Sequence, residues 1–318
     1  MTIDWRPRAL HAAVWRRTAN QRRTTPSASR RIVVFADPDT LRNHNASSLS
    51  ATRDALNALA GHGVVVVLWG DESRAELELI QQDLSIPHPF ISENGGGLFL
   101  PSGYFARLPS DARATAGYAV IDFGRPYHHV ADVLHEVADR LGVQVTSFRD
   151  LSITQVAEQR QLSLSQAALA KLREYDEPFR IASANPAVQS RLFTALRRAG
   201  LRSFAQGHYH HATGVADKAE SIRTLTALYR QTWTEVVTVG LASDPFEICL
   251  LQAVDIPVVI HSEAVDITRL LSKVPTARCV NSSDCRGWSE VLWRLVPGGS
   301  TALGESATQS RTSRHRRG

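Results

Sequence analysis

Three short acidic segments follow apolar runs of the sequence, and their residue types suit phosphate chemistry. They are Asp37-Pro38-Asp39-Thr40, Gly70-Asp71-Glu72-Ser73 and Ala242-Ser243-Asp244-Pro245-Phe246-Glu247. Two aspartates two residues apart at an extended strand end can point the same way. One could attack phosphorus, while the other could protonate the leaving oxygen and later activate water. The alternative role of an Asp-Pro-Asp segment is an ordinary turn and helix cap.

A magnesium ion and a lysine would balance this negative charge. Magnesium prefers hard oxygen ligands and usually takes only one or two carboxylates, together with waters and phosphate. Asp37 and Asp244 are candidates for those carboxylates. Lys218, one of only three lysines in the chain, is a candidate counter-charge. Without such a counter-charge, carboxylate and phosphate crowded together would repel each other.

The apolar runs predict the sheet that would position these residues. They are Ile32–Ala36, Val64–Trp69, Glu235–Leu241 and Ile256–Ile260. Short apolar runs without alternation are typical of parallel strands that are buried on both faces. Helical spacing between them, over Ser50–His62, Arg74–Leu84 and Lys218–Trp233, predicts an α/β fold with a Rossmann-like parallel sheet. In such sheets ligands bind beyond the carboxyl ends of the strands, where the acidic segments lie.

The middle of the chain predicts a second, inserted domain. Residues 106–205 combine weak strand signals with helical segments at His129–Leu141, Ser163–Tyr175 and Pro186–Ala199, which favours an α+β cap. The core domain would then comprise residues 31–105 and 206–297. The ends, 1–30 and 298–318, are expected to be basic, disordered tails.

Charge and composition restrict the function classes. The net charge is +5, but residues 1–31 carry +7, residues 298–318 carry +3, and the middle is therefore about −5. This distribution makes nucleic acid an unlikely partner of the folded part. The longest apolar run has six residues, too short to span a bilayer. Three cysteines and no secretory signal favour the cytoplasm.

Five stretches of the sequence together resemble a known family. They are Val34–Leu41, Ser73–Leu77, Pro89–Gly96, Arg173–Phe179, and a last set made of Thr213, Gly214, Asp217, Lys218, Gly240, Leu241 and Asp255–Val259. Their pattern resembles the haloacid-dehalogenase-like phosphatases, and more narrowly the mannosyl-3-phosphoglycerate phosphatase branch. The most specific segments are Glu-Asn-Gly within Pro89–Gly96 and Glu-Pro-Phe within Arg173–Phe179.

The resemblance implies a fold, a cofactor and residue roles. It implies a haloacid-dehalogenase-type core with an inserted cap, Mg²⁺ as cofactor, and a small phosphorylated sugar or sugar acid as substrate. Asp37 becomes the nucleophile, Asp39 the acid/base and Lys218 the charge-balancing lysine. The implied metal ligands are Asp37, Asp39, Asp244 and Glu247. The implied substrate-binding residues are Glu93, Asn94, Arg173, Glu177, Thr213 and Gly214. An ordinary ion pair at a helix end is the alternative role of Arg173 and Glu177.

The first two catalytic segments depart from the family pattern. A glycine is missing between Asp39 and Thr40, although glycine normally helps this loop to turn. Gly70 stands where the family has a serine or threonine that holds phosphate. Ser73 or backbone N–H groups are the remaining candidates for that role.

The third segment departs further. Ser243 stands at the position of a metal-binding aspartate, and Glu247 replaces a second one. A shift by one residue would bring Asp244 to the metal instead. Phe246 replaces an asparagine, and His208 stands where an arginine is common.

These observations leave two main functions open, besides a weaker third, an association of the arginine-rich ends with nucleic acid or a membrane. The first is a magnesium-dependent phosphatase of a phosphorylated sugar or sugar acid that acts through an aspartyl-phosphate. The second is a catalytically impaired relative with a binding or regulatory role, favoured by the altered segments. Because Asp37, Asp39 and Lys218 are all kept, the phosphatase is preferred.

Overall fold

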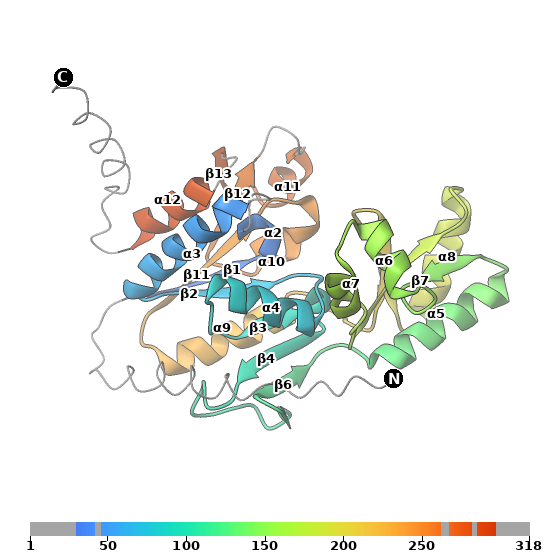
Figure 1. Ribbon diagram of the computed structural model, residues 1–318, viewed down its shortest axis with the longest axis horizontal. Helices are drawn as coiled ribbons and strands as arrows, with labels where there is room; N and C mark the ends of the chain where they lie inside the picture. The colour runs from blue at the N-terminus through green and yellow to red at the C-terminus, as the bar shows by residue number, and fades with distance from the viewer. Residues whose placement is uncertain (1–29, 42–45, 262–266, 282–284, 297–318) are drawn as a thin grey trace, which may run out of the picture.

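A computed structural model describes residues 30–41, 46–261, 267–281 and 285–296 of the chain. These residues form two bodies that lie side by side, a larger one built around a long sheet and a smaller one to its flank (Figure 1). The predicted tails, 1–30 and 298–318, lie outside the described residues apart from Arg30.

The larger body is built on one nine-stranded sheet, in the order β13-β12-β11-β1-β2-β3-β4-β6-β5. Its parallel strands are β13 (Arg278–Asn281), β12 (Ile256–His261), β11 (Val236–Ala242), β1 (Arg31–Ala36), β2 (Val64–Trp69) and β3 (Phe90–Ser92). An antiparallel extension adds β4 (Gly97–Pro101), β6 (Tyr118–Asp122) and β5 (Arg113–Thr115). The four strands predicted from apolar runs are confirmed as adjacent parallel strands.

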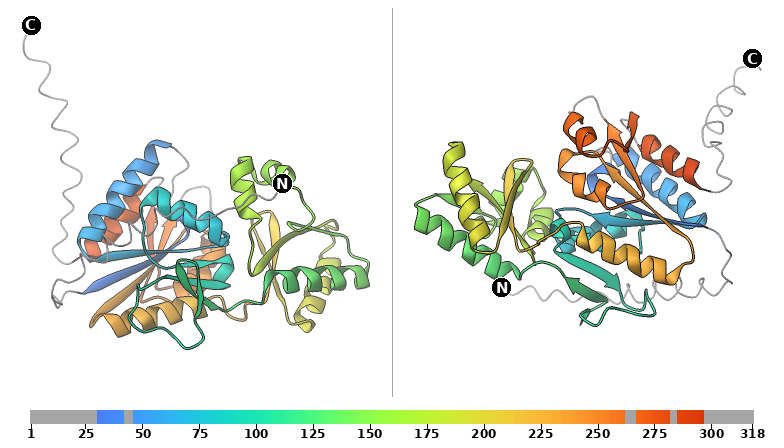
Figure 2. Two further views of the ribbon diagram at one scale, coloured as in Figure 1. Left: turned by 60° about the horizontal axis from the view of Figure 1, so that its bottom comes forward. Right: turned by 180° about the vertical axis from the view of Figure 1, so that it is seen from behind.

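Alternate residues of β1 show why these runs carry no polar positions. Ile32 and Val34 face α3 (Ala46–Gly61), α4 (Arg74–Leu84) and α12 (Cys285–Leu295). Val33 and Phe35 face the other way, towards α9 (Glu220–Thr232) and α10 (Ile248–Gln252). Helices thus cover both faces of the sheet (Figure 2), and α11 (Thr268–Lys273) packs with α10 near β12. The predicted α/β fold is confirmed.

The smaller body is the cap, a four-stranded antiparallel sheet with its own apolar core. The strand order is β7 (Val145–Ser147), β8 (Asp176–Ile181), β10 (Tyr209–Thr213) and β9 (Arg202–Gln206). The helices are α5 (Tyr127–Leu141), α6 (Ile153–Arg160), α7 (Leu164–Ala170) and α8 (Pro186–Arg198). Leu134, Leu192 and Phe179 are among the buried side chains that join α5 and α8 to the sheet.

The strand pairings place the domain boundaries differently from the predicted cap range 106–205. The strands β5 and β6 belong to the core sheet, because β6 pairs with β4 from Gly97 opposite Asp122 to Pro101 opposite Tyr118. Both β9 and β10 belong to the cap sheet. The chain therefore enters the cap after Asp122 and leaves it after Thr213. An apolar strand in the sequence does not reveal which sheet it joins, since pairing is decided by tertiary contacts.

Candidate active site

Three loops meet at the carboxyl edge of the central sheet. Strand β1 pairs in parallel with β11 on one side and with β2 on the other, so the three strands end together. The loops that follow them carry Asp37, the Gly70–Ser73 segment and the Ser243–Glu247 segment. The structure therefore brings together the three acidic segments that the sequence places after apolar runs.

The first loop turns without the glycine of the family pattern. The short helix α2 (Pro38–Leu41) begins directly after Asp37, with proline at its first position, where the missing N–H costs nothing. The Asp39 backbone N donates to Asp37 Oδ1 at 2.7 Å. The Asp37 side chain is partly buried, whereas Asp39 is exposed. Thr40 Oγ1 lies 2.9 Å from Ser243 Oγ, which ties this loop to the third one.

The second loop does not offer the Ser73 hydroxyl to a phosphate. Ser73 is fully buried and caps α4, where its Oγ accepts from the Glu76 N at 3.3 Å. The same oxygen donates to the Leu169 carbonyl of the cap at 2.8 Å. Backbone N–H groups remain as candidates for the phosphate site. Glu72, which the sequence analysis did not select, is buried in this loop.

The third loop uses its acids in a local capping arrangement. Glu247 Oε2 accepts from the backbone N of Ser243 at 2.8 Å and of Asp244 at 2.9 Å. Asp244 Oδ1 in turn accepts from the Phe246 N at 2.8 Å, which starts the short helix η2 (Pro245–Glu247). Glu247 Oε1 is buried and has no hydrogen-bond partner among the described residues. Oε2 of Glu247 thus stabilises the loop, whereas Oε1 is a candidate to bind a ligand.

Burial and mutual repulsion control the protonation of these acids. Burial, and then the charges of Glu247, Asp39 and Asp71, raise the pKa of Asp37 well above its usual value. Burial, and then the charges of Asp37 and Asp71, raise the pKa of Glu72 likewise. Burial also raises the pKa of Glu247 to about 8. These acids are therefore difficult to ionise unless a positive charge is bound beside them.

The donor set fits a hard divalent cation. Glu72 Oε2 and Glu247 Oε1 are buried carboxylate oxygens without a hydrogen-bond partner in the described part of the chain. The charge of Glu247 raises the pKa of Asp37, and the charge of Asp37 raises the pKa of Glu72. The described residues include no group of three His, Cys, Asp or Glu side chains placed to hold a metal ion. Magnesium does not need one, because waters and phosphate commonly complete its coordination.

Lys218 has a different partner from the one expected. Its Nζ donates to Asn94 Oδ1 at 2.8 Å and lies 3.3 Å from the centre of the Phe204 ring, a cation–π geometry. Burial lowers the pKa of Lys218 to about 8, opposed by the charges of Asp176 and Asp71. Its role as the counter-charge of Asp37 stays a prediction.

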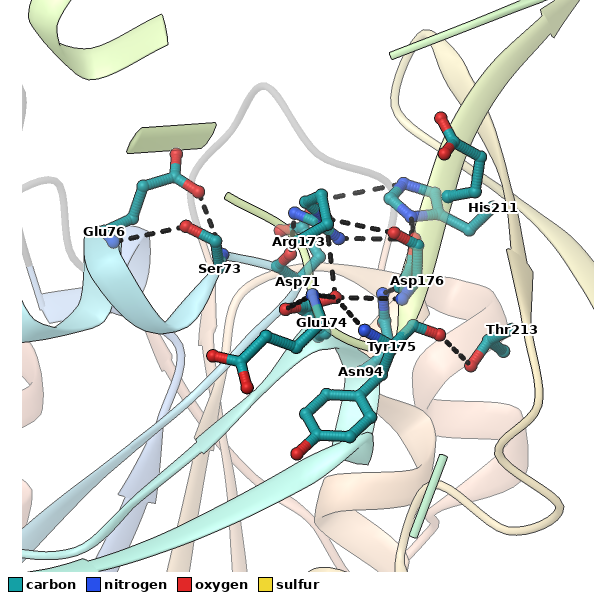
Figure 3. Close-up of polar contacts among 12 residues, drawn as sticks. Asp71, Ser73, Glu76, Asn94, Arg173, Glu174, Tyr175, Asp176, His211 and Thr213 are labelled. Atoms are coloured by element: carbon teal, nitrogen blue, oxygen red, sulfur yellow. Dashed lines mark hydrogen bonds and ion pairs between the residues drawn. The ribbon is translucent and has the colours of Figure 1, made fainter. Parts of the chain in front are cut away.

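Glu93 and Arg173 form the centre of a buried junction between core and cap. Figure 3 labels Arg173 and the cap residues Glu174, Tyr175 and Asp176 beside it. The Glu93 carboxylate accepts three backbone N–H groups of the cap segment, from Glu174 at 2.9 Å, Tyr175 at 2.7 Å and Asp176 at 2.8 Å. Arg173 Nε lies 3.6 Å from Glu93 Oε2, and both side chains are fully buried. Burial raises the pKa of Glu93 to about 7, although Arg173 opposes this.

Asp176 connects the rest of this junction. It accepts from Asn94 Nδ2 at 2.9 Å, pairs with His211 Nδ1 at 2.9 Å and lies 3.3 Å from Arg173 Nη2. Although burial raises the pKa of Asp176, His211 and Arg173 lower it to about 2. We call Glu93, Asn94, Arg173, Asp176 and His211 the junction network. Arg173 also donates to the Asp71 carbonyl at 2.8 Å (Figure 3). This hydrogen bond links the junction network to the carboxyl edge of the sheet where the three acidic loops meet, which we call the catalytic edge.

The other predicted substrate-binding residues also lie in packed surroundings. Glu177 is buried and accepts from the Arg149 N at 3.1 Å. Thr213 Oγ1 accepts from the Val215 N at 3.2 Å. A side chain at Gly214 would lie 2.7 Å from the backbone N of Arg125, so only glycine fits where the two connections cross. Their part in substrate binding stays a prediction.

A cavity of about 430 Å³ lies between the core and the cap. The core contributes Asp71 and Asp244, which follow β2 and β11. The cap contributes Phe148, Gln159, Arg160, Gln161, Pro178, Gln206, Gly207, His208, Tyr209 and His211. Of these, Pro178 and His208 stood out in the sequence. Arg160 gives no sequence signal because its relation to the cavity depends on how α6 packs.

Comparisons with known proteins identify the family. No protein-family model matches the chain. The chain is, however, 34% identical over 267 residues to the glucosyl-3-phosphoglycerate/mannosyl-3-phosphoglycerate phosphatase of Methanococcoides burtonii, covering 83% of this chain and 97% of that protein. The chain belongs to the glucosyl-3-phosphoglycerate/mannosyl-3-phosphoglycerate phosphatase family. A second phosphatase of this name, from Persephonella marina, is 28% identical over 276 residues, with 83% of this chain and 97% of that protein covered. The family predicted from the sequence resemblance is confirmed.

Solved structures support the fold of this phosphatase family member. A haloacid dehalogenase-like hydrolase from Bacteroides thetaiotaomicron superposes with a TM-score of 0.54 at 14% identity, covering 84% of this chain and 98% of that one. A protein from Thermoplasma acidophilum gives a TM-score of 0.56 at 14% identity, with 84% and 98% covered. The haloacid-dehalogenase-type core predicted from the sequence is confirmed at the level of the fold.

Proposed function

We propose that the chain is a magnesium-dependent phosphatase of a phosphorylated sugar acid, of the glucosyl- or mannosyl-3-phosphoglycerate kind. The supporting observation is the position of Asp37. It follows the central strand β1 at the carboxyl edge of the sheet and interacts with Asp71, which lines the cavity beneath the cap. This edge is where α/β sheets bind their ligands.

In the proposed reaction, an oxygen of Asp37 attacks the phosphorus atom of the substrate. The bond from phosphorus to the ester oxygen breaks, and that oxygen leaves with the electron pair and takes a proton from Asp39. Phosphate is then held on Asp37 as an acyl phosphate. Asp39 next takes a proton from a water molecule, which attacks phosphorus and restores the Asp37 carboxylate. Asp39 suits both proton transfers because it is exposed and its backbone N is bonded to Asp37.

The residues proposed to hold Mg²⁺ are Asp37, Asp39, Asp244 and Glu247. Bound there, the cation would stabilise the negative charge that develops when carboxylate and phosphate approach each other. Glu247 offers the buried Oε1 that no described residue occupies, whereas Asp244 caps η2 and also lines the cavity. Glu247 is thus the better placed of the two to face the cation.

The cap supplies the positive charge for the substrate's acid portion. Arg160 and His208 line the cavity opposite Asp71 and Asp244. A guanidinium group can bind a carboxylate through two parallel hydrogen bonds. The two relatives are named for substrates that contain phosphoglycerate, which carries a carboxylate beside its phosphate. We therefore expect a substrate with both groups to be preferred over a simple sugar phosphate.

A second function is favoured by one observation, the crowding of acids at the second loop. The carboxylate of Glu72 lies where the family pattern places a phosphate-binding hydroxyl side chain. If the cation does not offset this charge, phosphate would be repelled, and the protein would bind sugar acids without turnover. Substrate binding with no phosphate release would support this alternative.

The experiment measures phosphate release by the full chain from mannosyl-3-phosphoglycerate, glucosyl-3-phosphoglycerate, glucose 6-phosphate and p-nitrophenyl phosphate. Each assay is run with Mg²⁺ and with chelator. We expect the two phosphoglycerate conjugates to have the highest kcat/KM, and release to stop in chelator. Robust turnover in chelator, or the highest kcat/KM with a substrate that lacks a carboxylate, would contradict the proposal.

The proposed location of this phosphatase is the cytoplasm. Cys249 and Cys279 are free thiols, which suits a reducing compartment. Among the described helices, none combines the length and the apolar character that a bilayer crossing requires.

A further inference from the structure

In the second loop, the side chain of Glu72 occupies space that is free because Gly70 has no side chain. A Cβ atom at Gly70 would lie 2.0 Å from Glu72 Oε2 and 3.3 Å from Asp37 Oδ2. A serine or threonine at position 70 would therefore collide with the Glu72 carboxylate as it is placed here. The absence of a side chain at Gly70 is what allows Glu72 to extend alongside Asp37.

One oxygen of the Glu72 carboxylate, Oε2, has no hydrogen-bond partner in the described part of the chain. The residue is only 9% exposed. Asp37 Oδ2 borders the same space at Gly70, so the neighbour of Glu72 there is a second acid. A buried anion without a counter-charge is costly, by several kcal/mol for an ion removed from water. The nearest lysine considered for this role, Lys218, donates instead to Asn94.

We propose that Glu72 is a ligand of a divalent cation at the catalytic edge, which it shares with Asp37 across the space left open by Gly70. The orphaned Glu72 oxygen and Asp37 Oδ2 both border this space. Mg²⁺ accepts carboxylate oxygens, and water or a phosphate oxygen commonly completes its coordination. The chain therefore holds its cation with Glu72 where family members carry a phosphate-binding hydroxyl.

This inference rests on the proposed function only for the position of the cation next to Asp37. It concerns binding to the free protein, so it does not require turnover. Because Glu72 adds a negative ligand, the cation should bind before the substrate arrives. Hard cations that accept carboxylate oxygens, Mg²⁺ and Mn²⁺, are the expected occupants.

The test is isothermal titration calorimetry of MgCl₂ and MnCl₂ into the full chain without substrate. The variants are Glu72→Gln, which keeps the shape and removes the charge, and Gly70→Ser, which displaces the carboxylate. The matched control is Glu78→Gln, in helix α4 that follows this loop, where Glu78 lies 3.9 Å from Arg74 in an ion pair. We expect Kd to rise at least about tenfold in both variants and to stay unchanged in the control.

Folding is checked by the melting temperature in chelator. Glu72→Gln should melt at or above the wild-type temperature, because it removes a buried repulsion. Wild-type protein that binds neither cation, or a Glu72→Gln variant that binds as tightly as wild type, would overturn the inference. Glu72-dependent binding without phosphate release would overturn the proposed function and leave this inference standing.

Discussion

Two neighbouring regions of the molecule differ in whether their buried carboxylates lie beside positive groups or beside other acids. In the junction network, Arg173, His211 and backbone N–H groups surround the carboxylates of Glu93 and Asp176. At the catalytic edge, the charge of Glu247 acts on Asp37 and the charge of Asp37 acts on Glu72, so neighbouring groups of the same sign repel one another. The two regions meet at Asp71, whose carbonyl accepts from Arg173 and whose charge acts on Asp37.

This contrast separates structural charges from functional ones. A buried carboxylate that is fully paired holds elements in place, here the cap against the core. A buried carboxylate that is left unpaired costs stability unless a ligand supplies the missing charge. We therefore expect a cation to bind at the catalytic edge, whereas the junction network connects the cap to the core.

The largest expected effect is on stability, from the variant Arg173→Met. It leaves Glu93 and Asp176 buried without their shared cation, which typically costs about 3–5 kcal/mol. The control Arg74→Met breaks an ion pair to Glu174 at 3.0 Å whose side chains are 35% and 32% exposed. Exposed pairs contribute about 1 kcal/mol or less. Urea unfolding measures both, and equal losses would show that the junction network has no special role.

The second effect is a dependence of stability on pH. The pKa of Glu247 is raised in the folded protein from 4.5 to about 8. The free energy of unfolding should therefore fall as pH rises from about 4.5 to 8, by up to about 1.4 kcal/mol per pH unit. Glu93, with a pKa of about 7, adds a similar loss up to pH 7. Asp176 behaves oppositely, since its lowered pKa removes stability only as pH falls from about 4 to 2.

Saturating Mg²⁺ separates these contributions. It should reduce the loss that comes from the catalytic edge and leave the loss from Glu93 in the junction network. Melting temperatures measured from pH 5 to 8, in chelator and in Mg²⁺, test this. A slope that is identical under both conditions would mean that the cation does not reach the catalytic edge.

The smallest effect is expected from Ser243→Asp, which restores the aspartate of the family pattern. The substitution removes the contact between Ser243 Oγ and Thr40 Oγ1, and it places a second carboxylate close to that of Glu247. We expect a loss of about 1 kcal/mol in chelator that Mg²⁺ largely recovers. Ser243→Asn is the neutral control of similar shape. If the two variants are equally stable in chelator, charge crowding at this loop is not the cause.

Much of the fold could be predicted because it depends on local pattern. The apolar runs that became β1, β2, β11 and β12 need no polar positions, since helices cover both faces of the sheet. Placing the three acidic segments at one edge follows from that prediction alone. The boundaries of the cap could not be derived in the same way, because β6 and β10 join sheets that only tertiary pairing defines.

The roles of individual charges were harder to predict, since they depend on partners distant in the sequence. Arg173 and Glu93 are 80 positions apart and meet only through the folded junction. Lys218 is predicted to be the counter-charge of Asp37, and nothing in the sequence indicated that its Nζ would donate a hydrogen bond to Asn94 Oδ1. Glu72 was visible after the second apolar run, yet its importance depends on the space at Gly70. A spacing rule in the sequence contains none of these contacts.

The most direct test of the account is phosphate release from mannosyl-3-phosphoglycerate in Mg²⁺ by wild-type protein and by Asp37→Asn. The amide has nearly the shape of the carboxylate but is a poor nucleophile. We expect turnover by the wild type and a loss of at least about a thousandfold in kcat for the variant, with an unchanged or higher melting temperature. Equal rates for the two proteins, or no release by the wild type, would contradict it.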